Sequence, residues 1–156
     1  MKRLGFFAAL PFLLALTTPV VVTWSAPATV VRTRSPGTAS VRVRASLIPG
    51  WHIYSMTQKP GGPKPLTFAL EKAPGFSLGP VSGPKPENKY DAEFRTNTEV
   101  YSGEAIFVVP VRWTKPLAPG DTELKVIVRY MACSDKLCLP PRKETLTALI
   151  KQSGGK

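Results

Sequence analysis

The sequence is poor in the side chains that bind metals, with a single histidine, His52, and only two cysteines, Cys133 and Cys138. Structural zinc sites take four ligands drawn from cysteine and histidine. This chain cannot supply such a set, so we expect no metal centre. The chemistry inferred below also needs no organic cofactor.

Acidic residues are scarce as well, because 10 Asp and Glu face 21 Lys and Arg and give a formal net charge of +11. A positive excess favours acidic partners, nucleic acid or anionic membrane surfaces. The basic residues are nevertheless scattered, and the sequence contains neither a Lys/Arg block nor an RNA-binding strand motif. We therefore expect a solvated basic surface and no nucleic-acid partner.

Charge is absent altogether from residues 4–24, and two positive residues precede them. This pattern, with small residues near its end, is typical of a signal peptide. We expect a signal peptide over residues 1–28, cleaved near 25–28, and one exported domain over residues 29–156. The uncharged run is also about long enough to span a bilayer, so a retained N-terminal anchor is the alternative.

Long helices are excluded by 17 prolines and 12 glycines that are spread through the chain. Between them lie short segments in which apolar and polar residues alternate or β-favouring residues gather, as in half-buried strands. The expected strands cover residues 40–47, 51–54, 66–70, 90–94, 105–113, 122–130 and 144–150. Many short strands with this punctuation predict an all-β, immunoglobulin-like β-sandwich.

Cys133 and Cys138 lie between the last two expected strands and therefore at the tip of a hairpin. Export permits a disulfide between them. A bridge that closes so small a ring stabilises a fold by only about 2 kcal/mol, and a sandwich of this size has its own core. The nearby Lys136 favours a reactive thiolate, whereas Asp135 opposes it. The residues alone leave a structural bridge and a redox-active pair equally open.

Three stretches resemble the N-terminal periplasmic domain of the thiol:disulfide interchange protein DsbD. They are Gly50–Ser55, Gly61–Pro63 and Tyr130–Pro141, the last with both cysteines and a double proline. The resemblance spans roughly residues 40–150. It implies a sandwich with a redox-active cysteine pair on a hairpin and a protein-disulfide reductase type of activity in the periplasm.

The same resemblance implies roles for individual side chains. The second cysteine, Cys138, is expected to form the mixed disulfide with partners, and the first to resolve it. In that family a mobile cap loop with an aromatic residue covers the cysteines, which makes Phe94 the candidate lid and Glu93 a neighbouring acid. Tyr54 and His52 match aromatic positions beside the pair. Taken without the resemblance, His52 and Phe94 are also ordinary packing residues.

The partners that the resemblance implies are thioredoxin-fold proteins. Reducing equivalents would pass to periplasmic disulfide isomerases and to the thioredoxins of cytochrome c maturation. The family's longer members continue into membrane helices and a thioredoxin-like domain, whereas this sequence ends at Lys156. We therefore expect a stand-alone version whose membrane electron transporter is supplied in trans.

Two functions from other classes stay open. The first is a non-catalytic secreted β-sandwich that binds a partner and uses the disulfide structurally. The second is a binder of anionic surfaces that depends on the positive charge of the domain, and its binding would weaken with added salt.

Overall fold

The computed structural model describes residues 19–31, 37–118 and 120–152, and all regular structure in these residues is β. No helix within these ranges is long and apolar enough to cross a membrane. The twelve strands are β1 (Val22–Ser25), β2 (Thr29–Val31), β3 (Gly37–Leu47), β4 (Trp51–Tyr54), β5 (Thr67–Leu70), β6 (Phe76–Leu78), β7 (Glu87–Asp91), β8 (Thr96–Ser102), β9 (Glu104–Trp113), β10 (Thr122–Tyr130), β11 (Ala132–Ser134) and β12 (Arg142–Gln152).

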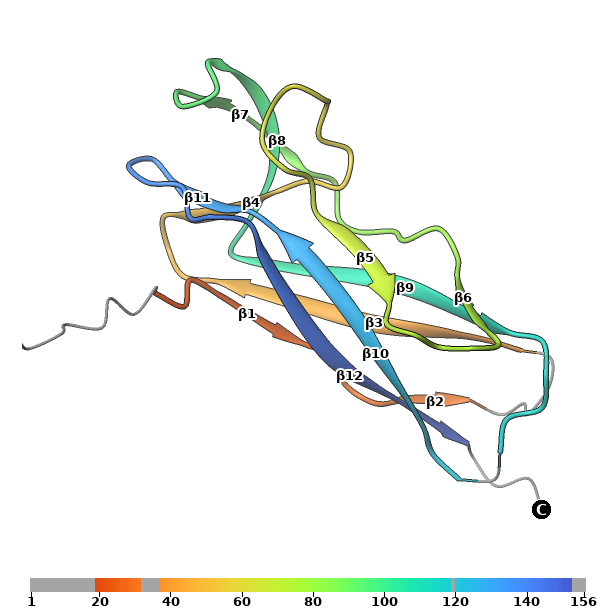
Figure 1. Cartoon of the computed structure of the whole chain (residues 1–156). Helices are drawn as coiled ribbons and strands as arrows, with labels where there is room; N and C mark the ends of the chain where they lie inside the picture. Colours follow the sequence, from red (N-terminus) through yellow and green to blue (C-terminus); the bar gives the residue numbers. More distant parts are fainter. Residues whose placement is uncertain (1–18, 32–36, 119, 153–156) are drawn as a thin grey trace, which may run out of the picture.

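Two four-stranded sheets form the body of the sandwich (Figure 1). One has the strand order β1-β3-β9-β6, and the other has the order β2-β12-β10-β5. All pairings are antiparallel except that of β2 with β12, which is parallel. The all-β sandwich predicted from the sequence is confirmed.

The core lies between these two sheets because alternate residues of the long strands point inward. On β3 the buried and exposed residues alternate without a break from Ser40 to Leu47. Val41, Phe107 and Val126, from three different strands, are each completely buried. Burial of one such side chain contributes about 1.5–3 kcal/mol, so the alternation fixes which face of each strand turns inward.

A third sheet, with the order β11-β4-β8-β7, continues from one end of the sandwich. Figure 1 shows the β7–β8 hairpin and the loop after β11 projecting together at this end. Both candidate site segments, the cysteine hairpin and the expected cap loop, therefore belong to the same small sheet.

The strand expected over residues 90–94 ends earlier than the sequence pattern predicts. β7 ends at Asp91, and its side-chain Oδ1 accepts hydrogen bonds from the backbone N–H groups of Glu93 (3.0 Å) and Phe94 (3.2 Å). Such local bonds draw the backbone out of a strand and into a turn. Arg95 completes the turn at a positive φ of 51°.

The segment before residue 29 contributes a strand that the sequence pattern assigned to the signal peptide. β1 pairs with β3, and its Val22 is buried with 5% of its surface exposed. The Trp24 ring packs against Tyr130 of the facing sheet at a centroid distance of 5.2 Å. Residues 1–18 lie outside the described residues, and cleavage near 25–28 stays a prediction.

Candidate functional site

The cysteine hairpin is held by β11, which pairs with β4. Cys133 lies opposite His52 in this ladder, and Cys133 and Cys138 form a disulfide with their Cα atoms 4.1 Å apart. The N–H of Ser134 donates to the carbonyl of Leu137 (2.8 Å), which closes the turn between the two cysteines. The predicted pair on a hairpin is therefore confirmed as a bonded pair.

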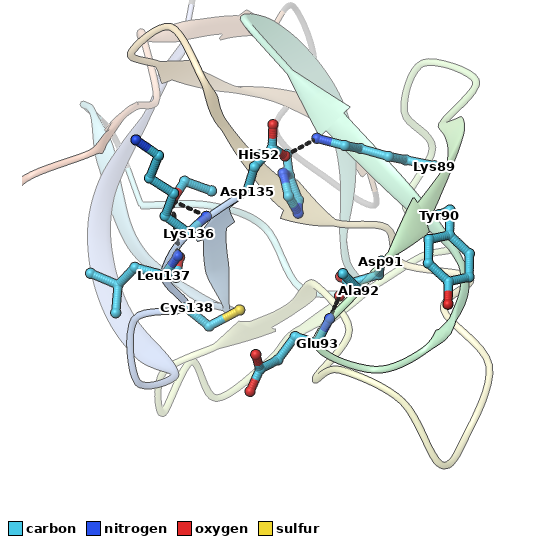
Figure 2. Close-up of a pocket in the computed structure, with 11 residues that line it drawn as sticks. His52, Lys89, Tyr90, Asp91, Ala92, Glu93, Asp135, Lys136, Leu137 and Cys138 are labelled. Atoms are coloured by element: carbon cyan, nitrogen blue, oxygen red, sulfur yellow. Dashed lines mark hydrogen bonds and ion pairs between the residues drawn. The ribbon is translucent and has the colours of Figure 1, made fainter.

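The two sulfur-bearing residues differ in accessibility. Cys133 is buried with 1% of its surface exposed, whereas Cys138 is partly exposed and lines a cavity of about 440 Å³. Figure 2 shows this cavity between the cysteine hairpin and the end of β7. Its lining residues are His52, Lys89, Tyr90, Asp91, Ala92, Glu93, Ser134, Asp135, Lys136, Leu137 and Cys138. A reagent that enters the cavity thus meets Cys138 first.

The turn after β7 brings Phe94 into contact with the cluster around the disulfide. Tyr54, Val100 and Cys133 form the buried part of this cluster, with Phe94 and Cys138 packed against it. The Phe94 ring meets the Tyr54 ring edge-on, with centroids 6.0 Å apart. Aromatic pairs prefer this geometry, which holds the turn down on the cluster.

A partly buried hydrogen bond links the same turn to the floor of the site. The hydroxyl of Tyr54 donates to Oδ2 of Asp91 (2.6 Å) and lies 3.9 Å from Sγ of Cys138. Burial, and then the bond to Asp91, raises the pKa of Tyr54 above its ordinary value of 10.0. The hydroxyl therefore keeps its proton at neutral pH and stays a donor beside the sulfur.

Asp91 is a site residue that the sequence reasoning missed. Oδ1 of Asp91 accepts the backbone hydrogen bonds that form the cap turn, and Oδ2 accepts the hydrogen bond from the Tyr54 hydroxyl. The sequence does contain an indication of this role, because Asp91 stands two residues before Glu93, and this spacing is typical of turns that an aspartate side chain closes.

An ion pair connects β7 with the cysteine hairpin. Nζ of Lys89 lies 2.5 Å from Oδ1 of Asp135, and its hydrogen bond, followed by its positive charge, holds the pKa of Asp135 below the usual range. Both side chains are exposed, by 43% and 76%, so the stabilisation is small. The pair links the β7 strand to the cysteine hairpin at the edge of the cavity.

His52 lies on β4 and is buried, with 5% of its surface exposed. Its ring meets that of Tyr54 edge-on at 5.4 Å, and both residues reach the site from the same face of the strand. Burial, with a smaller contribution from the charge of Lys89, lowers the pKa of His52. Glu93, by contrast, is exposed at the rim of the cavity.

Two exposed apolar side chains border the same cavity. Of the large hydrophobic residues that the structure describes, Tyr90 is 63% exposed and Leu137 is 55% exposed. They come from β7 and from the cysteine hairpin. Exposed apolar and aromatic side chains are typical of surfaces that contact other proteins.

The structure thus gathers all six side chains that the sequence predicted for the site, namely Cys133, Cys138, Phe94, Glu93, Tyr54 and His52. Among the described residues, no three acidic, cysteine or histidine side chains gather in a way that could hold a metal ion. The chemistry available to the site is that of the sulfur pair and of the proton-bearing groups around it.

Comparison with solved structures finds similar folds. The N-terminal domain of DsbD from Neisseria meningitidis in the reduced form has a TM-score of 0.53 and 21% identity, over 86% of each chain. The N-terminal periplasmic domain of ScsB from Proteus mirabilis has a TM-score of 0.61 and 19% identity, over 85% of this chain and 48% of that one. The Neisseria meningitidis DsbD domain in complex with the PilB N-terminal domain has a TM-score of 0.50 and 20% identity, over 80% of each chain.

No protein with a curated description matches the chain. Sequence-family comparison does give a match, and it covers residues 19–150, from the segment before β1 to Ile150 of β12. The family matched is that of the thiol:disulfide interchange protein DsbD, N-terminal. Because this match spans most of the chain and includes both cysteines, the chain belongs to the family of DsbD N-terminal domains.

Proposed function

We propose that this protein relays reducing equivalents between periplasmic proteins through reversible opening of the Cys133–Cys138 disulfide. The observation that carries the proposal is the unequal exposure of the pair, with Cys138 partly exposed in a cavity and Cys133 buried behind it. A purely structural bridge gains nothing from a cavity that leads to one of its sulfurs. The family match supports thiol–disulfide exchange as the reaction.

The proposed reaction begins when a thiolate of the donor attacks Sγ of Cys138. A donor–Cys138 disulfide forms, and Cys133 leaves as a thiolate with the electron pair of the broken bond. The second thiol of the donor then attacks the mixed disulfide and releases Cys138. The reduced domain passes its electrons on when Cys138 attacks an acceptor disulfide and Cys133 resolves the product.

The proposed partners are thioredoxin-fold proteins, of the disulfide-isomerase and cytochrome c maturation types, and a membrane electron transporter supplied in trans. A DsbD N-terminal domain has been solved in complex with the PilB N-terminal domain, which supports protein partners for this family. On this chain the exposed Tyr90 and Leu137 flank Cys138 and offer apolar contact to such a partner. Export to the periplasm, by a cleaved signal or with a retained anchor, belongs to the same proposal.

The reduction potential of the pair tests this function against a structural role. We expect the disulfide to equilibrate with a dithiol buffer within the range of thioredoxin-like donors, because the ring is small and Cys138 is accessible. The measurement is the fraction of reduced protein, by thiol labelling and mass, across a series of dithiothreitol ratios. A potential well below about −300 mV would place the bridge beyond such donors and favour the non-catalytic sandwich.

Removal of the candidate lid should make the disulfide easier to reach. We expect Phe94→Ala to speed reduction by a small thiol by about tenfold, which corresponds to a closure free energy of about 1.4 kcal/mol. The physical reason is that the Phe94 ring packs on Tyr54 within the cluster that contains both cysteines. The measurement is the second-order rate constant for reduction by dithiothreitol under conditions where the protein stays folded.

Phe76→Ala is the matched control for this prediction. It removes a phenylalanine of similar partial burial that packs against Trp113, remote from the site. Its rate of reduction should equal that of the unaltered protein. If Phe94→Ala were reduced no faster than Phe76→Ala, the aromatic ring would be a packing residue and not a lid.

A further inference from the structure

One polar atom beside the disulfide has no hydrogen-bond partner. Nε2 of His52 is buried, and none of the described residues supplies it with a donor or an acceptor. A buried polar atom without a partner costs free energy, so its retention calls for an explanation. The imidazole is the only histidine side chain in the protein.

His52 lies beside the buried Cys133 in the sheet. His52 and Cys133 are direct partners across the antiparallel β4–β11 ladder. Side chains of such partners project to the same face and lie close together. His52 also lines the cavity that exposes Cys138 (Figure 2).

The hydrogen-bonding capacity of Cys133 changes with its redox state, and only the reduced form has a proton that the unpaired Nε2 of His52 can accept. In the disulfide, Sγ of Cys133 has no proton to donate. After reduction, the Cys133 thiol carries an S–H group, while the residue itself is only 1% exposed. The imidazole of its cross-strand partner, His52, can accept this proton and gives the buried thiol a route to the thiolate that it needs as a nucleophile.

We propose that His52 is the acid–base partner of Cys133, an inference that rests on the proposed function of the pair. In the resolving step, Nε2 takes the proton of the Cys133 thiol. The freed electron pair of Sγ forms the bond to Sγ of Cys138, and the partner leaves from Cys138 as a thiolate with the electron pair of the mixed disulfide. The proton on His52 then returns through water in the cavity to the released thiolate. The opening step is the reverse, with His52 giving the proton to Cys133.

The charges around the ring suit this role. Burial and Lys89 keep the imidazole neutral at pH 7, whereas Asp91 and Asp135 favour its protonated form. These three residues face His52 from β7 and from the cysteine hairpin, and Tyr54 borders it on β4. A neutral imidazole can accept a proton, and the two carboxylates stabilise the cation that forms for the duration of the step.

The test follows the two phases of a reaction with oxidised glutathione. Reduced protein is mixed with oxidised glutathione between pH 5 and pH 9, quenched with acid, and analysed by mass for the glutathione adduct and for the closed disulfide. Formation of the adduct reports attack by Cys138, and its decay reports resolution by Cys133. We expect His52→Gln to slow resolution at pH 7 by roughly ten- to a hundredfold while formation of the adduct is little changed.

The pH profile separates proton transfer from a structural effect. In the unaltered protein the resolution rate should stay nearly flat from pH 7 to pH 9 and fall in acid, where His52 becomes protonated. In His52→Gln the rate should rise about tenfold per pH unit as the thiol ionises by itself, so that the two proteins converge near pH 9. Trp51→Phe is the control, because this neighbour lies on the opposite face of β4.

Two results would overturn the inference. One is resolution by His52→Gln at the rate of the unaltered protein at pH 7. The other, which needs no variant and so does not depend on its folding, is a resolution rate in the unaltered protein that climbs tenfold per pH unit from pH 7 to pH 8. In both cases the adduct still forms and closes, so the proposed exchange function would stand. A protein that forms no adduct at all would contradict that function instead.

Discussion

Cys133→Ser is expected to trap a covalent complex with a thioredoxin-fold partner through Cys138, whereas Cys138→Ser is expected to trap none and to lose exchange activity altogether. Cys138 is the sulfur that lines the cavity, and Cys133 is buried beneath it. When the buried sulfur is replaced, the mixed disulfide that forms at Cys138 cannot be resolved from within the domain. When Cys138 is replaced, the remaining thiol has no access to a partner.

The two variants are controls for each other. Each removes the same disulfide, so each loses the same loop constraint of about 2 kcal/mol, and any difference between them is a difference in chemistry. The measurement is the yield of disulfide-linked complex after incubation with a thioredoxin-fold protein that carries one cysteine in its active site, on a non-reducing gel. Equal trapping by both variants, or by Cys138→Ser alone, would contradict the assignment of the attacking sulfur.

Much of this arrangement could be predicted from sequence because it depends on local patterns. The alternation of buried and exposed residues along 40–47 marks β3 without help from the rest of the chain. The cysteine spacing likewise places the pair at the tip of a hairpin between β10 and β12. In both cases the information lies within a few consecutive residues, where periodicity is a reliable guide.

The features that could not be predicted depend on contacts between distant segments. Asp91 meets Tyr54 across 37 positions, and Lys89 meets Asp135 across 46. The partners of each pair come from separate segments of the chain, so no periodicity within one segment indicates them. The unequal burial of the two cysteines also escapes any local pattern, since it arises from the packing of Cys133 with Tyr54 and Val100. These contacts define the cap and the accessible sulfur, so only the three-dimensional structure shows which sulfur is accessible and which residues cover it.

The sequence pattern of residues 22–25 predicts part of a signal peptide for a related reason. A run of uncharged, apolar residues has the same composition whether it enters a membrane or completes a sheet. Pairing with β3 and packing between the sheets are what distinguish the two, and neither is visible in composition. Cleavage near residues 25–28 would remove β1 from the exported protein, whereas the packing of β1 requires that these residues stay.

A chain that begins at Thr29 is therefore expected to be less stable than one that begins at Pro19, by at least about 3 kcal/mol. That figure is the lower end of the range for removing one large aromatic side chain, and the truncation removes the buried Val21 and Val22 together with the partly buried Trp24. Without β1 the rings of Phe107 and Tyr130 lose Trp24, which lies 6.3 Å and 5.2 Å from them between centroids. The measurement is the free energy of unfolding of both chains in urea, followed by tryptophan fluorescence and circular dichroism.

Two substitutions in the longer chain separate packing from chain length. Trp24→Ala should reproduce most of the loss, since it deletes the ring and keeps the β1 backbone. Thr23→Ala alters the exposed neighbour on the same strand and should leave the free energy of unfolding within about 0.5 kcal/mol. Equal stability of the chains that begin at Thr29 and at Pro19 would mean that β1 is dispensable and that cleavage near 25–28 leaves a complete domain. A large difference, together with a mature N-terminus upstream of Val22 by mass spectrometry, would make β1 part of the working protein and move the cleavage site towards the N-terminus.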